Sequence, residues 1–190
     1  MKKLILDDIK WFALILAGSA IIWAFIFAQM YKPADNEKIT LFVTAERCDN
    51  GYFEQKILSA ADLKQATVVC YSHSDRNYSE LFQVQGLLSA DIIILKTEEF
   101  ADKAMTTAFL PLTDDILNKY GIPTDGLVYF DSVAYAVRIY DAEAGVDVFG
   151  DKLGFSENDS YCIGINITSK NADAGGDDNA LKVLASLLAG

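Results

Sequence analysis

The feature that most constrains this chain is a long uncharged stretch near its N-terminus. No Asp, Glu, Lys or Arg occurs from Trp11 to Met30, a run of 20 residues. At about 1.5 Å per residue a helix of this length spans roughly 30 Å, the thickness of a bilayer's hydrocarbon core. The stretch therefore predicts a transmembrane helix at residues 11–30. Its length, and the absence of a small-residue cleavage motif after it, disfavour the alternative of a cleaved signal peptide.

Basic residues around this stretch predict its orientation. Three lysines precede it and two follow it closely: Lys2, Lys3, Lys10, Lys32 and Lys38. Because positive charge favours the cytoplasmic side, residues 1–10 are expected to form a cytoplasmic tail. Residues 31–38 then form a tether, and residues 39–190 form an extracellular domain on a single-pass protein of the cell membrane.

Charge and cysteine content limit the partners of this domain. The net charge of the chain is −11, and residues 1–30, with three lysines and two aspartates, carry +1, so the rest of the chain carries −12. An acidic domain argues against nucleic acid as a partner. His73 is the only histidine and no C-x-x-C motif occurs, so no zinc site is expected. Cys70 and Cys162 lie in apolar runs and are expected to be buried thiols, with a single disulfide as the alternative.

Short apolar runs predict the class of the domain. Runs at 39–43, 67–71 and 91–95 are rich in β-branched or aromatic residues and do not alternate with polar ones. This composition is typical of strands buried on both faces, as in parallel sheets. The segments between them carry helical signals, such as the capping box of Asn77 and Glu80. The order predicts an α/β domain with a mostly parallel sheet flanked by helices.

The second half of the domain has a different pattern. Residues 127–130 and 133–140 are expected to be two strands of a hairpin, and residues 161–167 another strand. Residues 141–160 and 168–178 are polar and are expected to be loops. Helices are predicted after Thr97, from Thr113 to a stop at Gly121, and over residues 180–188.

The strand ends supply the candidate ligand-binding residues. In open α/β sheets ligands bind beyond the carboxyl ends of the parallel strands. Tyr71 would offer a stacking surface, and the two arginines an anion contact. The residues expected at a binding site are Glu46, Arg47, Tyr71, His73, Asp75, Arg76, Thr97 and Glu98.

Catalytic signals are missing from the sequence. It has no G-x-S-x-G motif, no phosphate-binding loop and no H-E-x-x-H motif. Ser72, His73 and Asp75 are neighbours in sequence, which does not make a catalytic triad. We expect no catalytic residue, no metal and no cofactor. A weak calcium site in the oxygen-rich segment 171–179 is an alternative to a plain loop, although EF-hand spacing is absent.

Three phrases of the sequence resemble a known family. They are Ser89-Ala90-Asp91-Ile92-Ile93-Ile94-Leu95-Lys96, Phe109-Leu110-Pro111-Leu112-Thr113, and Tyr161 to Asn166 followed by Thr168-Ser169-Lys170-Asn171. Together they resemble extracellular solute-binding proteins of bacterial ABC transporters, which have the type 2 periplasmic-binding fold. The likeness covers about residues 38–190, which would build roughly one of that family's two lobes.

The resemblance implies a non-enzymatic function. It suggests a bacterial, membrane-anchored domain that binds a small-molecule solute or a protein partner at the cell surface. One lobe lacks the opposing wall that buries most of a ligand's surface. The alternative is therefore a structural or accessory protein with a degenerate cleft and no small-molecule ligand.

Overall fold

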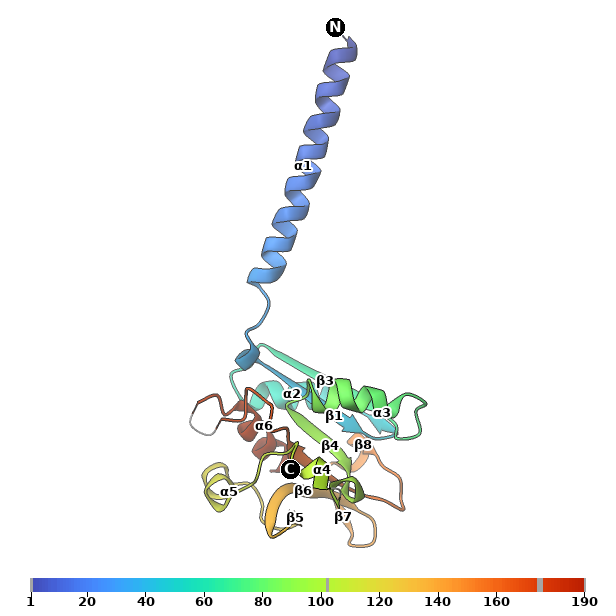
Figure 1. Ribbon diagram of the computed structural model, residues 1–190, viewed down its shortest axis with the longest axis vertical. Helices are drawn as coiled ribbons and strands as arrows, with labels where there is room; N and C mark the ends of the chain where they lie inside the picture. Colours follow the sequence, from blue (N-terminus) through green and yellow to red (C-terminus); the bar gives the residue numbers. More distant parts are fainter. Residues whose placement is uncertain (1, 102, 174–175, 190) are drawn as a thin grey trace. The chain divides into compact units, whose positions relative to one another are not determined.

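The computed structural model describes residues 2–101, 103–173 and 176–189 (Figure 1). The chain divides into two compact units, residues 1–34 and 35–190. The first unit is helix α1 (Lys2–Met30). Its segment Lys10–Phe27 is long and apolar enough to cross a membrane, and none of that segment is buried within the protein. The large apolar side chains exposed along it include Trp11, Phe12, Leu14, Ile15, Leu16, Ile21, Ile22, Trp23 and Phe25.

The second unit is built on a seven-stranded sheet with the order β3-β1-β4-β9-β6-β5, in which β7 pairs with β6. Its strands are β1 (Lys38–Thr44), β3 (Gln65–Tyr71), β4 (Ile92–Lys96), β5 (Leu127–Phe130), β6 (Val133–Asp141), β7 (Val146–Asp147) and β9 (Ser160–Ile165). The three apolar runs that the sequence indicated are therefore the strands β1, β3 and β4. The predicted hairpin is formed by β5 and β6. The expected α/β class is confirmed.

Strand direction divides this sheet into two halves. Strands β3, β1 and β4 are paired in parallel, with Val43 opposite both Cys70 and Ile94. Strand β9 then runs antiparallel between β4 and β6, and β6 pairs antiparallel with β5. Four of the seven strands run in one direction, so the sheet is mostly parallel in direction. Its hydrogen-bonded parallel pairs, however, lie within β3, β1 and β4.

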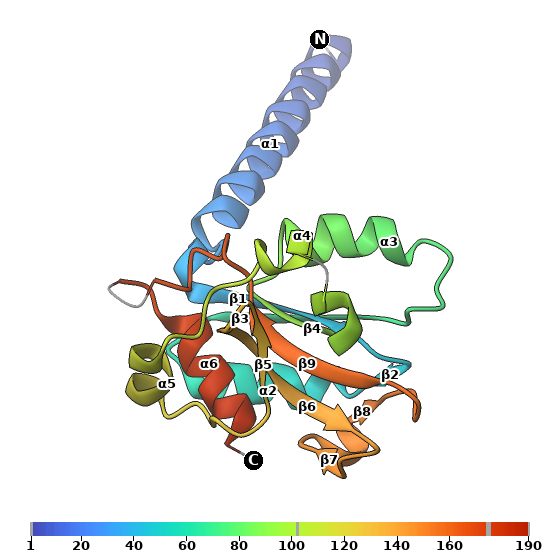
Figure 2. The same ribbon diagram turned by 60° about the horizontal axis from the view of Figure 1, so that its bottom comes forward.

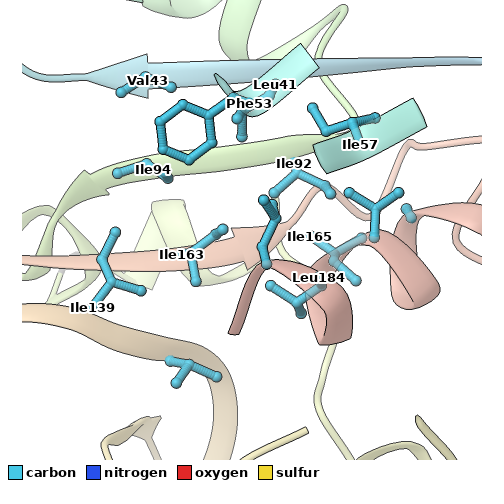
Figure 3. Packing of buried hydrophobic residues seen from close by; sticks show 14 of the residues in the cluster. Leu41, Val43, Phe53, Ile57, Ile92, Ile94, Ile139, Ile163, Ile165 and Leu184 are labelled. Carbon is cyan, nitrogen blue, oxygen red and sulfur yellow. The ribbon is translucent and has the colours of Figure 1, made fainter. Parts of the chain in front are cut away.

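Helices cover both faces of the sheet (Figure 2). Helix α2 (Asn50–Ala60) and helix α6 (Asn179–Leu188) pack on one face. Figure 3 shows Phe53 and Ile57 of α2 and Leu184 of α6 against Ile94 and Ile163 of the sheet. On the other face lie α3 (Tyr78–Leu81) and the π-helical turn η2 (Phe82–Leu87), whose Phe82 packs on Phe42. Both layers bury apolar side chains from adjacent strands, which explains the runs without alternation.

Several local predictions need correction. Residues 141–160 are not a plain loop, because they contain β7, the 3-10 turn η4 (Gly150–Lys152) and β8 (Leu153–Gly154). Strand β8 pairs with β2 (Arg47–Cys48) in a separate two-stranded sheet. Asn77 precedes α3 but makes no side-chain capping bond, so the predicted capping box is wrong. After Thr97 the chain forms only a 3-10 turn, η3 (Thr97–Ala101), and the short α4 (Lys103–Thr106).

Other local signals are confirmed. Helix α5 (Asp114–Tyr120) begins after Thr113, whose hydroxyl accepts a hydrogen bond from the Ile116 amide at 3.4 Å. It ends at Gly121, which has a φ of 66°. Glycine occupies this left-handed conformation without the strain that a Cβ would add.

A buried polar network ties the amino ends of the central strands to the segment after β9. The Asp91 carboxylate accepts hydrogen bonds from the Thr40 amide at 2.8 Å, from Asn171 Nδ2 at 3.0 Å and from the Ser169 hydroxyl. The side-chain nitrogen of fully buried Asn166 lies 3.3, 2.8 and 3.0 Å from the carbonyl oxygens of residues 86, 87 and 90. Two of the three sequence phrases thus encode this network.

The network also holds Asn171, which belongs to the segment considered for a calcium site. Its side-chain nitrogen lies 3.2 Å from the Asp35 carbonyl oxygen, 3.1 Å from that of Lys38 and 3.0 Å from Asp91 Oδ1. Its side-chain oxygen is buried and has no hydrogen-bond partner among the described residues. Asp178 accepts from the Tyr120 hydroxyl at 2.9 Å and pairs with Lys182. In the described part of segment 171–179 no group of three metal-ligating side chains occurs.

Candidate functional site

The carboxyl ends of β1, β3 and β4 meet at one edge of the sheet. Because β9 is antiparallel to β4, its first residues lie at the same edge, with Tyr161 opposite Lys96. A cavity of about 190 Å³ opens there. It is lined by Thr44, Ala45, Glu46, Ser72, His73, Ser74, Lys96, Ser156, Asp159 and Tyr161.

A second hollow of about 360 Å³ shares His73 with the first. It lies along α3 and η2, on the opposite side of the loop that follows β3. Its lining residues are His73, Asp75, Arg76, Tyr78, Ser79, Phe82, Gln83, Leu87, Glu99 and Met105. We call His73 and six residues that each line one of the two hollows the carboxyl-end cluster: Thr44, His73, Tyr78, Lys96, Glu99, Asp159 and Tyr161.

His73 is held at the centre of the carboxyl-end cluster by two contacts. Its Nε2 lies 3.1 Å from Glu99 Oε1. Its ring packs on Tyr78 with 4.8 Å between ring centroids. The Tyr78 hydroxyl in turn shares a 2.8 Å hydrogen bond with the buried Thr44 hydroxyl. Burial raises the pKa of Tyr78, so this phenol stays neutral and serves as a hydrogen-bonding group.

Glu99 is the least well solvated carboxylate of the cluster. Burial raises its pKa, and the neighbouring His73 offsets part of that effect. Its Oε1 faces His73, while its buried Oε2 has no hydrogen-bond partner among the described residues. A buried acceptor without a partner costs free energy. Glu99 also lines the second hollow.

Lys96 and Asp159 form the other charged pair of the cluster. Their Nζ and Oδ2 atoms lie 2.8 Å apart, and the Lys96 side chain is mostly buried. The hydrogen bond between them raises the pKa of Lys96 and lowers that of Asp159. Both groups are therefore charged and paired near neutral pH. Because the Asp159 carboxylate balances the charge of Lys96, the first cavity is polar but carries no strong net positive charge.

The side chains around the two hollows are polar or aromatic, and the serine, histidine and aspartate that are neighbours in sequence face different partners. His73 faces the Glu99 carboxylate, whereas Asp75 accepts a 2.9 Å hydrogen bond from the Ser72 amide. The neighbouring Ser72, His73 and Asp75 are thus not arranged as a relay. The cluster instead offers hydroxyl, imidazole, carboxylate and aromatic groups around two small hollows. These groups suit a small polar molecule that has hydroxyl or amide groups.

The structure brings together four of the eight residues expected at a site. Glu46 and His73 line the first cavity, and His73, Asp75 and Arg76 line the second hollow. The other four residues line neither of these hollows. Tyr71 hydrogen-bonds Gln85 at 3.3 Å, and Arg47 donates to the Asp151 carbonyl oxygen. The exposed Glu98 carboxylate lies 3.9 Å from Lys96 Nζ of the cluster. Thr97 lines a separate hollow of about 200 Å³ with Phe100, Val128, Tyr129, Phe130 and Tyr135.

The sequence did not indicate Thr44, Tyr78, Glu99, Asp159 or Tyr161 as site residues. Lys96 stands at the end of β4, where the rule of parallel strand ends does place it at the site. Asp159 and Tyr161 lie at the start of a strand, and they reach the site only because β9 runs antiparallel to β4. No signal in the sequence marks that direction.

Replacing Glu99 with glutamine is expected to stabilise the domain at neutral pH. Because burial raises the pKa of Glu99 above its usual 4.5, the folded state loses stability as pH rises from that value through the raised pKa. Glutamine keeps a hydrogen-bonding oxygen without the buried charge. We expect a gain of about 0.5–1 kcal/mol in unfolding free energy at pH 7 that vanishes below about pH 4.

Urea unfolding at several pH values measures this difference. Glu98→Gln is the matched control, because Glu98 is the adjacent carboxylate and its side chain is 74% exposed. The control should change stability little at any pH. A loss of stability in Glu99→Gln at pH 7 would mean that the ion pair with His73 outweighs the cost of burial.

The chain was compared with protein families, curated protein sequences and solved structures. No protein-family model matches the chain, and no curated protein sequence matches it. Among solved structures, an ABC substrate-binding protein from Listeria monocytogenes in complex with cycloalternan is 17% identical, with a TM-score of 0.42. The maltose-binding periplasmic protein MalE from the same organism, in complex with maltose, is 14% identical, with a TM-score of 0.38.

The overlap with both structures is partial. The alignments cover 54% and 55% of this chain, but only 28% and 27% of the two binding proteins. The chain therefore spans little more than a quarter of each protein's length.

Proposed function

We propose that this chain is a single-pass membrane protein that holds a binding domain outside the cell. Helix α1 would span the bilayer with residues 11–30, leaving residues 1–10 in the cytoplasm. Its exposed aromatic and aliphatic side chains support this part of the proposal, because no protein core covers them. In solution, the apolar side chains of this 29-residue helix would stay in contact with water. Insertion into lipid would remove them from water.

The carboxyl-end cluster is the proposed binding site. The observation that carries this proposal is the convergence of three parallel strand ends and the start of β9 on two hollows that share His73. Glu99 and Tyr78 line the second hollow, where they would offer a carboxylate and an aromatic surface. The ligand class that fits is a small polar solute. Its affinity is expected to be modest, because both hollows are open on one side.

One feature favours the alternative of an accessory protein that docks a partner. The hollow lined by Thr97, Phe100, Val128, Tyr129, Phe130 and Tyr135 is mainly aromatic, and Tyr129 is 61% exposed. Exposed aromatic side chains are enriched at protein interfaces. A docking protein would use this surface and leave the carboxyl-end cluster without a ligand.

Thermal unfolding of the full-length protein in detergent, with panels of sugars, amino acids and short peptides, tests the proposal. A solute present at 100 times its Kd stabilises the folded state by about 2.7 kcal/mol. For a domain of this size that amount raises Tm by roughly 5–10 °C. His73→Ala is expected to abolish the shift, whereas Glu98→Gln should keep it. Absence of any shift across the panels, or a shift that His73→Ala leaves intact, would contradict the assigned site.

A further inference from the structure

Two of the three cysteines lie next to one another although 21 residues separate them in sequence. Cys48 is in β2, and Cys70 is in the edge strand β3. Both are half-buried and pack against the apolar cluster under α2. Cys162, by contrast, is fully buried against the opposite face of the sheet. The expectation that Cys70 is a buried thiol is therefore only partly met.

Contacts on either side of the two cysteines fix their proximity. Before Cys48, the Ala45 amide donates to the Tyr71 carbonyl oxygen at 3.0 Å. After Cys48, the Asn50 side chain donates to the Val68 carbonyl oxygen at 3.4 Å. The segment from 45 to 50 thus runs alongside residues 68–71, with one cysteine inside each span. Cys70 Sγ also lies 3.5 Å from the Ala45 carbonyl oxygen.

Each thiol also shifts the pKa of the other, because the neighbouring sulfur raises the pKa of Cys48 and lowers that of Cys70. Cys70 therefore forms its thiolate more readily than Cys48. Thiolates are the reactive form in disulfide exchange, and an adjacent second thiol can resolve the mixed disulfide.

We propose that Cys48 and Cys70 form an intramolecular disulfide bond that fastens β2 to the edge strand β3. In the reaction the Cys70 thiolate attacks a small-molecule disulfide such as oxidised glutathione and releases one glutathione thiolate. Cys48 then loses its proton and attacks the mixed disulfide, which releases the second glutathione. Two protons and two electrons leave the pair, and one glutathione disulfide is reduced to two glutathione thiols.

The bond would act on the first cavity of the carboxyl-end cluster. Cys48 is two residues beyond Glu46, and Cys70 is two residues before Ser72, and both of those residues line this cavity. A covalent link directly behind them fixes the two wall segments relative to each other. Oxidation in the cell rests on the proposed function, because disulfides persist on the oxidising side of a membrane.

Trypsin separates the three cysteines cleanly, which makes the bond easy to detect. Cleavage after lysine and arginine places Cys48 in peptide 48–56, Cys70 in peptide 65–76 and Cys162 in peptide 153–170. Purified full-length protein in detergent is treated with oxidised glutathione, alkylated under denaturing conditions, digested and analysed by mass spectrometry without reductant. The expected product is peptide 48–56 linked to peptide 65–76, with peptide 153–170 alkylated.

Two results would overturn the pairing: alkylation of both partner peptides after oxidation, or a link that involves peptide 153–170. Oxidation should also raise Tm by roughly 5–10 °C in the wild-type protein. Cys48→Ser and Cys70→Ser should each remove that rise, and Cys162→Ala should retain it. A wild-type rise that persists in Cys48→Ser would equally contradict the pairing.

The same peptides from whole cells, quenched with acid before alkylation, separate this proposal from the proposed function. Linked peptides in that sample support both. If the purified protein forms the link but the cellular protein is fully alkylated, the pairing stands and the placement of the domain outside the cell is overturned.

Discussion

Replacing Asn166 with alanine is expected to lower the free energy of unfolding by about 3 kcal/mol. The Asn166 side chain is fully buried at the end of β9, and its nitrogen serves the carbonyl oxygens of residues 86, 87 and 90. Those carbonyls lie where η2 ends, and helix termini leave such groups without partners along the helix. Alanine would remove this partner from the buried carbonyl oxygens of residues 87 and 90, whereas that of residue 86 would keep the Ala90 amide, 3.1 Å away.

Matched variants separate this effect from a general loss of an amide. Asn158→Ala removes an exposed asparagine from the loop before β9 and should change stability by less than about 0.5 kcal/mol. Asn166→Asp should be at least as damaging as alanine at pH 7, because its carboxylate would face carbonyl oxygens. Urea unfolding followed by circular dichroism measures all three. A cost below about 1 kcal/mol for Asn166→Ala would show that water replaces the amide.

Removing residues 1–32 is expected to move the protein from the membrane fraction to the soluble fraction without unfolding the domain. The second compact unit begins at Asp35, and its buried core begins at Ile39. The deletion therefore removes no core side chain. We expect the fragment 33–190 to keep a cooperative thermal transition within a few degrees of that of the full chain.

A charge placed in helix α1 gives a finer test of the same anchor. Arginine near the centre of a spanning helix costs about 2.5–3.5 kcal/mol of insertion free energy. Leu16→Arg combined with Ile22→Arg should therefore release the full-length chain from membranes, whereas Leu16→Ala combined with Ile22→Ala should not. Retention of the double arginine variant in carbonate-washed membranes would contradict a spanning role for residues 11–30.

The outline of the fold could be predicted because it depends on local composition. The strands at 38–44, 65–71 and 92–96 are apolar on both sides because helices cover both faces of the sheet. The Thr113 cap and the Gly121 stop depend only on nearby backbone groups. Residues 147 and 154, in contrast, belong to two-residue strands, which are too short to show any periodicity.

Strand order is what the sequence could not supply. Strand β9 follows β6 in the chain, yet it lies between β4 and β6. This insertion brings Asp159 and Tyr161 to the edge where His73 lies. Of the eight residues that the rule of parallel strand ends predicted, four therefore line the two hollows. The rule could not predict the residues that come from the antiparallel strand. Glu99 was missed for a related reason, because its contact with His73 joins two loops through tertiary packing.

Protease treatment of intact cells tests the central claim, that helix α1 holds the acidic domain outside the cell. Antibodies against residues 35–190 follow the domain, and a cytoplasmic protein serves as the control for cell integrity. The account predicts that the domain is digested in intact cells while the control survives, and that before digestion the full-length chain is in the membrane pellet. A domain that resists protease until the cells are lysed, or a product in the medium without residues 1–30, would contradict it.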